Sequence, residues 1–134
     1  MNEVRALIEK ASRSFDAADR LLEAGDADFA ASRTYYSYFY VAEALLLDEE
    51  RSVSTHAGVI GEYGRLFAKT GRLDSRFHRL LHRAFRVRQA GDYDTDFDLS
   101  VSDVRELLEE GRNFLAAAQA HLRREDAGDE EDRS

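Results

Sequence analysis

Among the basic residues of this chain, Arg88 has the position that exposure to solvent explains least well. On a helical wheel with Phe77 at zero, Arg88 falls at about 20°, inside an apolar face. That face also carries Leu80, Leu81, Ala84 and Phe85. An unpaired guanidinium is costly to remove from water, so the pattern predicts one of two arrangements. Arg88 either pairs with a carboxylate in the interior or at a helix end, or it faces a ligand or a cleft between subunits.

Four further arginines lie together on the opposite side of the same wheel, at about 180° to 260°. This arginine stripe consists of Arg76, Arg79, Arg83 and Arg86. A row of positive charges on an acidic protein is a candidate nucleic-acid-binding surface, because it can contact successive phosphates. The alternative is a solvated helix face with acidic neighbours.

Two histidines of this segment, His78 and His82, have the i, i+4 spacing of zinc ligands. No glutamate follows His78 as in a His-Glu-x-x-His motif, and the neighbouring arginines repel cations. The chain has no cysteine, so it has no thiolate ligand either. We therefore expect no metal at this pair.

Acidic residues alternate along residues 92–98, and Asp103 stands at the twelfth position of a calcium loop that would begin at Asp92. The sixth position is Phe97 where the loop needs glycine, and the twelfth is Asp where it needs a bidentate Glu. We expect instead a solvated acidic loop with Tyr93 and Phe97 packed inward, and no metal or other cofactor.

Composition narrows the class of protein. The chain has 134 residues, of which 43% are hydrophobic and 34% charged, and its net charge is −8. This size suits one domain, and no apolar run is long enough to cross a membrane. The first residues lack a secretory signal, so we expect a cytoplasmic protein without a membrane partner. The negative charge argues against broad nonspecific DNA binding, so any nucleic-acid contact needs a local basic patch.

The spacing of apolar residues predicts five helices, over about residues 3–23, 26–49 (or 28–49), 55–69, 74–90 and 100–123. Gly25, Gly71 and Gly91 are the expected stops, and Asp74 and Ser100 the expected N-caps. The second helix is apolar almost all round, which places it at the centre. The predicted fold class is all-α: an up-down antiparallel helical bundle of four to five helices over residues 1–124, followed by an acidic disordered tail over residues 125–134.

Three short motifs follow one another along these helices. They are Ser32-Arg33-Thr34-Tyr35-Tyr36-Ser37-Tyr38-Phe39 with the apolar run 41–47, then Thr55-His56-Ala57-Gly58-Val59, and then Arg88-x-x-x-Asp92-Tyr93. In this order and spacing they resemble the small stand-alone branch of the HEPN family, over about residues 11–122.

The resemblance implies a helical bundle that forms a homodimer and, in many relatives, a metal-independent ribonuclease site where two subunits meet. That site uses an Arg-x4-His motif, in which Arg88 fits the arginine while Tyr93 replaces the histidine. Tyrosine is a poor base near neutral pH because its pKa is about 10. His56 could supply an imidazole, or it could instead fix the start of the third helix.

Other relatives work beside a small nucleotidyltransferase, as a toxin or as a substrate-binding subunit. Two functions therefore follow from the resemblance. The first is a binding or toxin-type subunit with a nucleotidyltransferase partner that contacts RNA. The alternative is an active endoribonuclease that uses Arg88 with Asp92, Tyr93 or His56.

Overall fold

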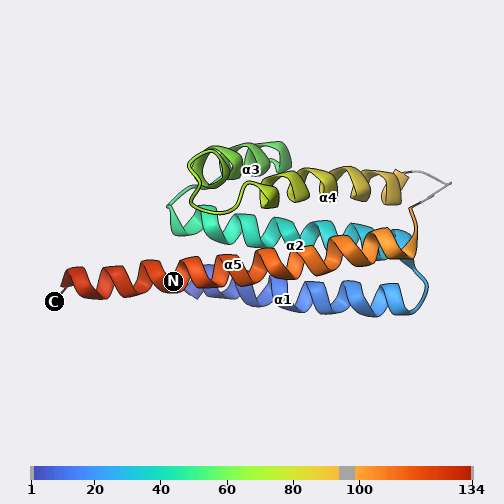
Figure 1. Ribbon diagram of the computed structural model, residues 1–134, viewed down its shortest axis with the longest axis horizontal. Coiled ribbons are helices and arrows are strands. Elements are labelled where there is room, and N and C mark those ends of the chain that lie inside the picture. The colour runs from blue at the N-terminus through green and yellow to red at the C-terminus, as the bar shows by residue number, and fades with distance from the viewer. Residues whose placement is uncertain (1, 94–98, 134) are drawn as a thin grey trace.

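The computed structural model describes residues 2–93 and 99–133, and their secondary structure is entirely helical. The elements are α1 (Asn2–Glu23), α2 (Ala27–Asp48), α3 (His56–Tyr63), a π-helical turn η1 (Gly64–Ala68), α4 (Arg76–Tyr93) and α5 (Val101–Arg133). Helices α1, α2, α4 and α5 alternate in direction, and α3 with η1 makes the crossing between α2 and α4 (Figure 1). The all-α, up-down bundle predicted from the sequence is confirmed.

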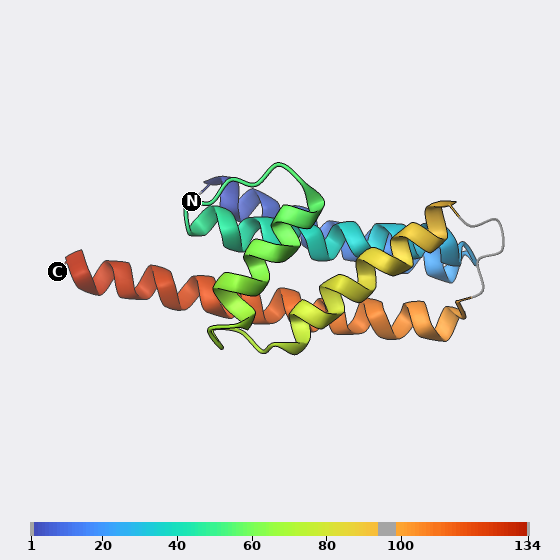
Figure 2. The same cartoon turned by 90° about the horizontal axis from the view of Figure 1, so that it is seen from above.

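Helix α2 lies at the centre of the bundle and packs against α1, α3, α4 and α5. In Figure 2, α4 crosses diagonally over α2. The buried side chains of α2 include Tyr35 and Tyr38, and the hydroxyl of Tyr38 donates a hydrogen bond to the Leu107 carbonyl at 2.7 Å. The Tyr38 ring packs on Phe15 of α1 and Phe114 of α5. The central position expected from the apolar sequence of this helix is therefore correct.

Local signals set several helix ends as expected. Gly25 and Gly71 have positive φ values of 89° and 75° after α1 and η1, a backbone region that favours glycine. The Asp74 carboxylate accepts a hydrogen bond from the Arg76 amide at 2.9 Å. Ser100 Oγ accepts one from the Asp103 amide at 3.0 Å, and Asp103 Oδ2 accepts one from the Ser100 amide at 3.4 Å. These last two contacts form the capping box predicted for α5.

The helix predicted over 55–69 is found as α3 followed by η1, with a π turn from Gly64, where a Cβ atom would come within 2.5 Å of His78 Nε2. Two predicted helix ends are wrong. Gly91 does not stop α4, which continues to Tyr93 while Asp92 pairs with Arg88 one turn earlier.

Helix α5 runs to Arg133 instead of ending near Arg123, and it extends past the other helices (Figure 1). The expected disordered tail therefore begins as a continuation of α5. Residues 123–127 are Arg, Arg, Glu, Asp and Ala, most of them good helix formers, and the chain has no proline to interrupt them.

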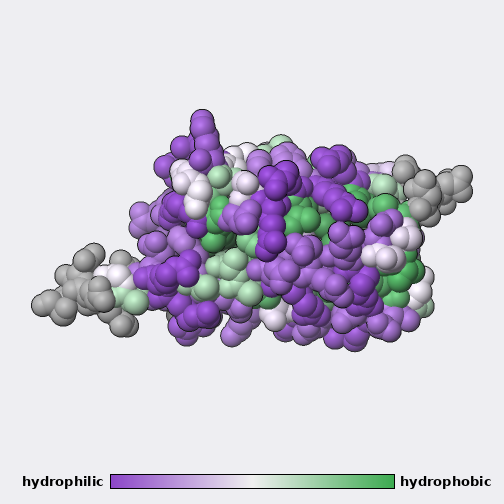
Figure 3. All heavy atoms as spheres, viewed as in Figure 1, coloured by the Kyte–Doolittle hydropathy of each residue, from purple (hydrophilic) through white to green (hydrophobic). Residues whose placement is uncertain are grey.

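Hydrophilic side chains cover most of the face drawn in Figure 3. None of the helices in the described ranges combines the length and the apolar character that crossing a membrane requires.

Candidate functional site

The Arg88 side chain lies between α4 and α2 and is 19% exposed. Its Nη2 donates a hydrogen bond to the Tyr36 hydroxyl at 3.1 Å. Its Nε lies 2.9 Å from Asp92 Oδ2, but the N–H does not point at that oxygen, so the contact is an ion pair without a well-directed hydrogen bond. The guanidinium carbon is 5.3 Å from the centre of the Tyr36 ring and 5.8 Å from that of Tyr35. Arg88 thus pairs with a carboxylate, which was the first arrangement predicted from the sequence. Part of its surface also stays open to solvent, as the second arrangement, a ligand or a cleft between subunits, requires.

His56 is the first residue of α3, and the sequence around it fixes its position. The Thr55 hydroxyl accepts a hydrogen bond from the Gly58 amide at 2.9 Å and so caps the helix. A Cβ atom on Gly58 would come within 2.5 Å of Val53 Cγ1, so only glycine fits this turn without movement. Val59 is buried in the core. Thr55 therefore holds the helix start, and His56 is left to contact α2.

The His56 ring stacks on Phe39 with 4.5 Å between centroids, and its Nδ1 lies 2.5 Å from the Tyr35 hydroxyl. Burial lowers the pKa of His56 below its usual value, and the Arg88 guanidinium lowers this pKa further. Burial raises the pKa of Tyr35 well above its usual value, so Tyr35 keeps its proton. His56 is therefore a neutral imidazole near pH 7, and since Nδ1 is taken up by Tyr35, Nε2 is the nitrogen that can meet a ligand.

Arg88 and His56 are brought together by the two tyrosines that they share. The His56 ring centre is 5.6 Å from that of Tyr35 and 5.9 Å from that of Tyr36. Arg88 contacts the same two rings from α4. A fixed guanidinium can stabilise an anion, and a neutral imidazole beside it can accept a proton. The arrangement suits a phosphate group next to a hydroxyl.

Tyr93 does not join this group. The tyrosine is 74% exposed, so the prediction that it packs inward is wrong. Phe97 and the alternating acids from Asp94 to Asp98 lie outside the described residues. Of the predicted site residues, the structure therefore brings together Arg88, Asp92 and His56 and leaves Tyr93 at the surface.

Tyr35, Tyr36 and Phe39 hold the two polar groups, and the sequence predicted only that they belong to the central, almost wholly apolar second helix. Their i, i+1 and i+4 spacing on an aromatic-rich helix was visible. Their packing partners could not be seen in the sequence, because Arg88 lies 52 residues from Tyr36 and His56 lies 21 residues from Tyr35.

The arginine stripe lies at the surface of α4, beside α5 and away from His56. Its four residues and Leu80 line a shallow hollow of about 380 Å³ together with Glu106 and Glu110 of α5. Arg79 donates a hydrogen bond to Ser75 Oγ, and Arg76 lies over the Phe77 ring. No ion pair joins the stripe to an acid within the part of the chain that the structure describes. The stripe thus has acidic neighbours and still presents positive charge.

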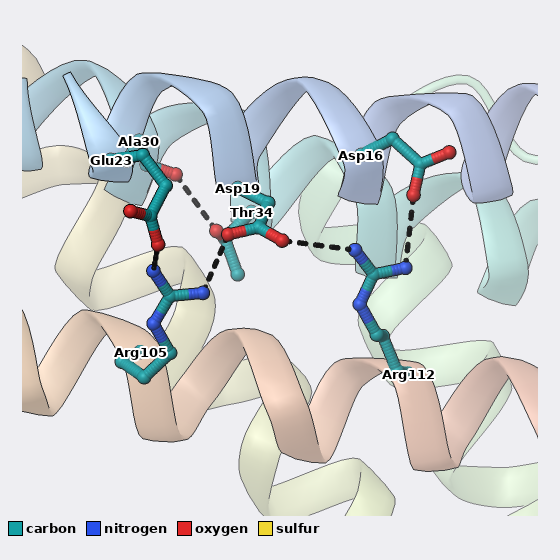
Figure 4. Close-up of polar contacts among 7 residues, drawn as sticks. All are labelled: Asp16, Asp19, Glu23, Ala30, Thr34, Arg105 and Arg112. Carbon is teal, nitrogen blue, oxygen red and sulfur yellow. Dashed lines mark hydrogen bonds and ion pairs between the residues drawn. The ribbon is translucent and has the colours of Figure 1, made fainter.

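Arg105 and Arg112 of α5 are different, because acids of α1 neutralise them. Arg105 binds Asp19 and Glu23, both at 2.6 Å, and Arg112 binds Asp16 at 3.1 Å (Figure 4). The Arg105 hydrogen bond also lowers the pKa of Asp19. These contacts join the first helix to the last and leave little positive charge for a ligand.

His78 and His82 do lie together, with 4.7 Å between their ring centres. His78 Nε2 is 3.1 Å from the Ile60 carbonyl, so this nitrogen is already engaged. Over residues 2–93 and 99–133, no three side chains of the metal-binding types come close enough to hold an ion.

Known proteins match this chain over nearly all of these elements. The sequence model of the HEPN domain matches residues 4–122. A candidate toxin of Methanocaldococcus jannaschii is 37% identical over 120 residues, which cover 90% of this chain and 82% of the relative. A UPF0332 protein of Thermotoga maritima is 32% identical over 89% of this chain and 93% of its own length. A second candidate toxin of Methanocaldococcus jannaschii is 36% identical over 70% of each chain.

Proposed function

Because the chain belongs to the HEPN domain family, we propose that it is a toxin-type subunit that binds RNA at Arg88 and His56 and is controlled by a nucleotidyltransferase partner. The observation that carries the proposal is the placement of Arg88 and His56 on the same two tyrosines. A cation close to an imidazole whose pKa is lowered by burial marks a candidate ligand site.

The ligand chemistry follows from the charges. The chain carries a net charge of −8, so it repels polyanions except at local basic sites. Arg88 offers a planar group suited to a phosphate, and His56, which contacts the same two tyrosine rings, would meet the adjoining sugar through Nε2. Asp92 holds Arg88 in place at 2.9 Å and is itself 30% exposed, so it can be displaced when a phosphate arrives.

Two partners belong to the proposal. A second copy of the chain would set two Arg88 sites near each other. A nucleotidyltransferase would suppress the toxic activity. Relatives named as candidate toxins support the toxin part of this proposal.

A second function is favoured by one specific observation, the lowered pKa of His56. A neutral imidazole whose Nδ1–H donates to the Tyr35 oxygen has a free Nε2, which can take the proton of a ribose 2′-hydroxyl. The 2′-oxygen then forms a bond to the adjacent phosphorus while the bond from phosphorus to the 5′-oxygen breaks, and the leaving 5′-oxygen takes up a proton from the imidazolium or from water. Arg88 would stabilise the negative charge that develops on the phosphate oxygens. In this endoribonuclease His56 replaces the motif histidine whose position Tyr93 occupies, and no metal is needed.

The experiment is controlled expression of the chain in a bacterial host, with growth as the readout. We expect the unsubstituted chain to inhibit growth, Arg88→Gln to abolish inhibition at equal protein level, and co-expression of a partner nucleotidyltransferase to relieve inhibition. Growth that is unaffected by the folded chain would refute the toxin-type function.

A cleavage assay on purified protein with RNA and EDTA separates the two functions. The ribonuclease predicts loss of cleavage in Arg88→Gln and His56→Gln, with Tyr93→Phe and the matched control His82→Gln remaining active. RNA binding without any cleavage would leave the binding subunit and exclude the ribonuclease.

A further inference from the structure

A second guanidinium lies against the same tyrosine that Arg88 contacts. The guanidinium carbon of Arg33 is 5.4 Å from the centre of the Tyr36 ring, and that of Arg88 is 5.3 Å from it. The Tyr36 ring is 6.4 Å from that of Tyr40, one turn along α2, and Lys10 Nζ of α1 lies 4.8 Å from the Tyr40 centre. We call Arg33, Tyr36, Tyr40 and Lys10 the tyrosine track.

The cations of the track are less neutralised than four of the other arginines. Arg65, Arg72, Arg105 and Arg112 each lie within 4.0 Å of a carboxylate. In the described residues, Arg33 and Lys10 have no such contact. Glu43 is the acid whose field reaches Lys10, and burial raises the pKa of its carboxyl. Two like charges that share one ring repel each other, so an anion bound between Arg33 and Arg88 would be favoured.

Arg33 is also fixed in position. Its Nη1 donates to Ser14 Oγ at 3.5 Å, and Ser14 Oγ lies 2.7 Å from Ser37 Oγ. Both serines are buried between α1 and α2. A guanidinium held over a ring at a half-buried position loses little further freedom when it binds, which favours affinity.

We propose that the tyrosine track binds the strand of single-stranded RNA that leads into the Arg88 site, with successive phosphates on Arg88 and Arg33 and a base stacked on Tyr36 or Tyr40. The inference rests on the proposed function, since it extends the same site. Aromatic rings alternating with cations suit a single strand, because its bases are free to stack while its phosphates meet the positive charges. Base-paired RNA hides those base faces.

The test is fluorescence anisotropy of a labelled twelve-nucleotide single-stranded RNA of mixed A and U, titrated with the full chain at several salt concentrations. We expect Arg33→Gln to lower the slope of log affinity against log salt by about 0.7, the contribution of one phosphate contact. Tyr36→Leu should weaken binding roughly 5- to 150-fold, the effect of one lost stacking contact. Tyr36→Phe should retain most of the affinity because it keeps the ring, and Arg33→Lys should retain the salt slope.

The matched control is Arg20→Gln, which removes the same charge from an exposed position of α1 and should leave binding unchanged. If Arg88→Gln weakens binding while Arg33→Gln and Tyr36→Leu bind like the unsubstituted chain, the track is refuted and the proposed function stands. If the unsubstituted chain binds no RNA, both are refuted. Light scattering completes the test: if Arg33→Gln or Tyr36→Leu turns a dimer into a monomer whose RNA affinity is unchanged, this face is an interface between copies and the track is refuted.

Discussion

Replacement of Arg88 by alanine separates a functional arginine from a structural one. The substitution removes an ion pair with Asp92, a hydrogen bond to Tyr36 and two contacts with tyrosine rings. We expect the protein to remain folded while RNA binding and growth inhibition are lost.

The magnitude of the stability loss follows from how exposed the pair is. Arg88 and Asp92 are 19% and 30% exposed, so water can solvate the carboxylate that remains. The pair therefore lies between a surface pair worth about 0–1 kcal/mol and a sealed pair whose disruption costs about 3–5 kcal/mol. The hydrogen bond contributes about 1 kcal/mol and the ring contacts about 0.5–1 kcal/mol. Since these three contributions come from one side chain and overlap, we expect Arg88→Ala to lower the free energy of unfolding by about 2 kcal/mol, or Tm by roughly 6–10 °C.

The assay combines urea unfolding with RNA binding, and Asp92→Asn is the matched variant. It breaks the same ion pair but leaves the guanidinium, so it should cost at most about 1 kcal/mol and keep or strengthen RNA binding. A loss above about 4 kcal/mol for Arg88→Ala would mean that the arginine serves the fold. A folded Arg88→Ala protein that binds RNA as before would refute the assignment of the site.

Three other predictions concern the surroundings of this site and the core. Arg88→Gln removes a positive charge near His56, so the pKa of His56 should rise toward its usual value in an NMR titration; an unchanged pKa would place the two groups too far apart. Gly58→Ala should destabilise the protein by about 1–3 kcal/mol in urea unfolding because its Cβ meets Val53 and Thr55. Gly61→Ala in the same helix has free space for its Cβ and should stabilise the protein by about 0.5–1 kcal/mol. Equal effects of the two substitutions would contradict the capping geometry. Burial lowers the pKa of His121, so on acidification the unfolded chain takes up a proton at this residue before the folded chain does. The free energy of unfolding should therefore fall as pH drops from 7 through the usual histidine pKa of about 6.5. A His121→Leu protein with the same pH slope would assign the effect to another group.

The sequence predicted the fold well because its signals are local. Glycine at 25 and 71 and the caps at Asp74 and Ser100 act within a few residues, and each set a helix end as expected. The same reasoning failed at Gly91, because a glycine is tolerated inside a helix when the next turn gains a contact such as Arg88 with Asp92. The family resemblance is confirmed over residues 4–122.

Only part of the candidate site could be predicted from the sequence. The wheel placed Arg88 on the apolar face, which was correct, and the i, i+4 acid was visible in the sequence. The pairing of His56 with Tyr35, and of Arg88 with Tyr36, depends on how α3 and α4 cross α2, and no local pattern determines that crossing. Tyr93, which was expected to pack inward, is exposed.

Photo-crosslinking tests the central claim, that RNA binds where Arg88, His56 and Tyr36 meet. RNA containing 4-thiouridine would be irradiated with the full chain, digested with trypsin, and the labelled peptides identified by mass spectrometry. Cleavage after Arg33 and Arg51 releases residues 34–51 as one peptide that contains Tyr35, Tyr36 and Tyr40. We predict that the crosslink falls in this peptide and disappears in Arg88→Gln. A crosslink confined to the peptides of the arginine stripe, unchanged by that substitution, would contradict the account.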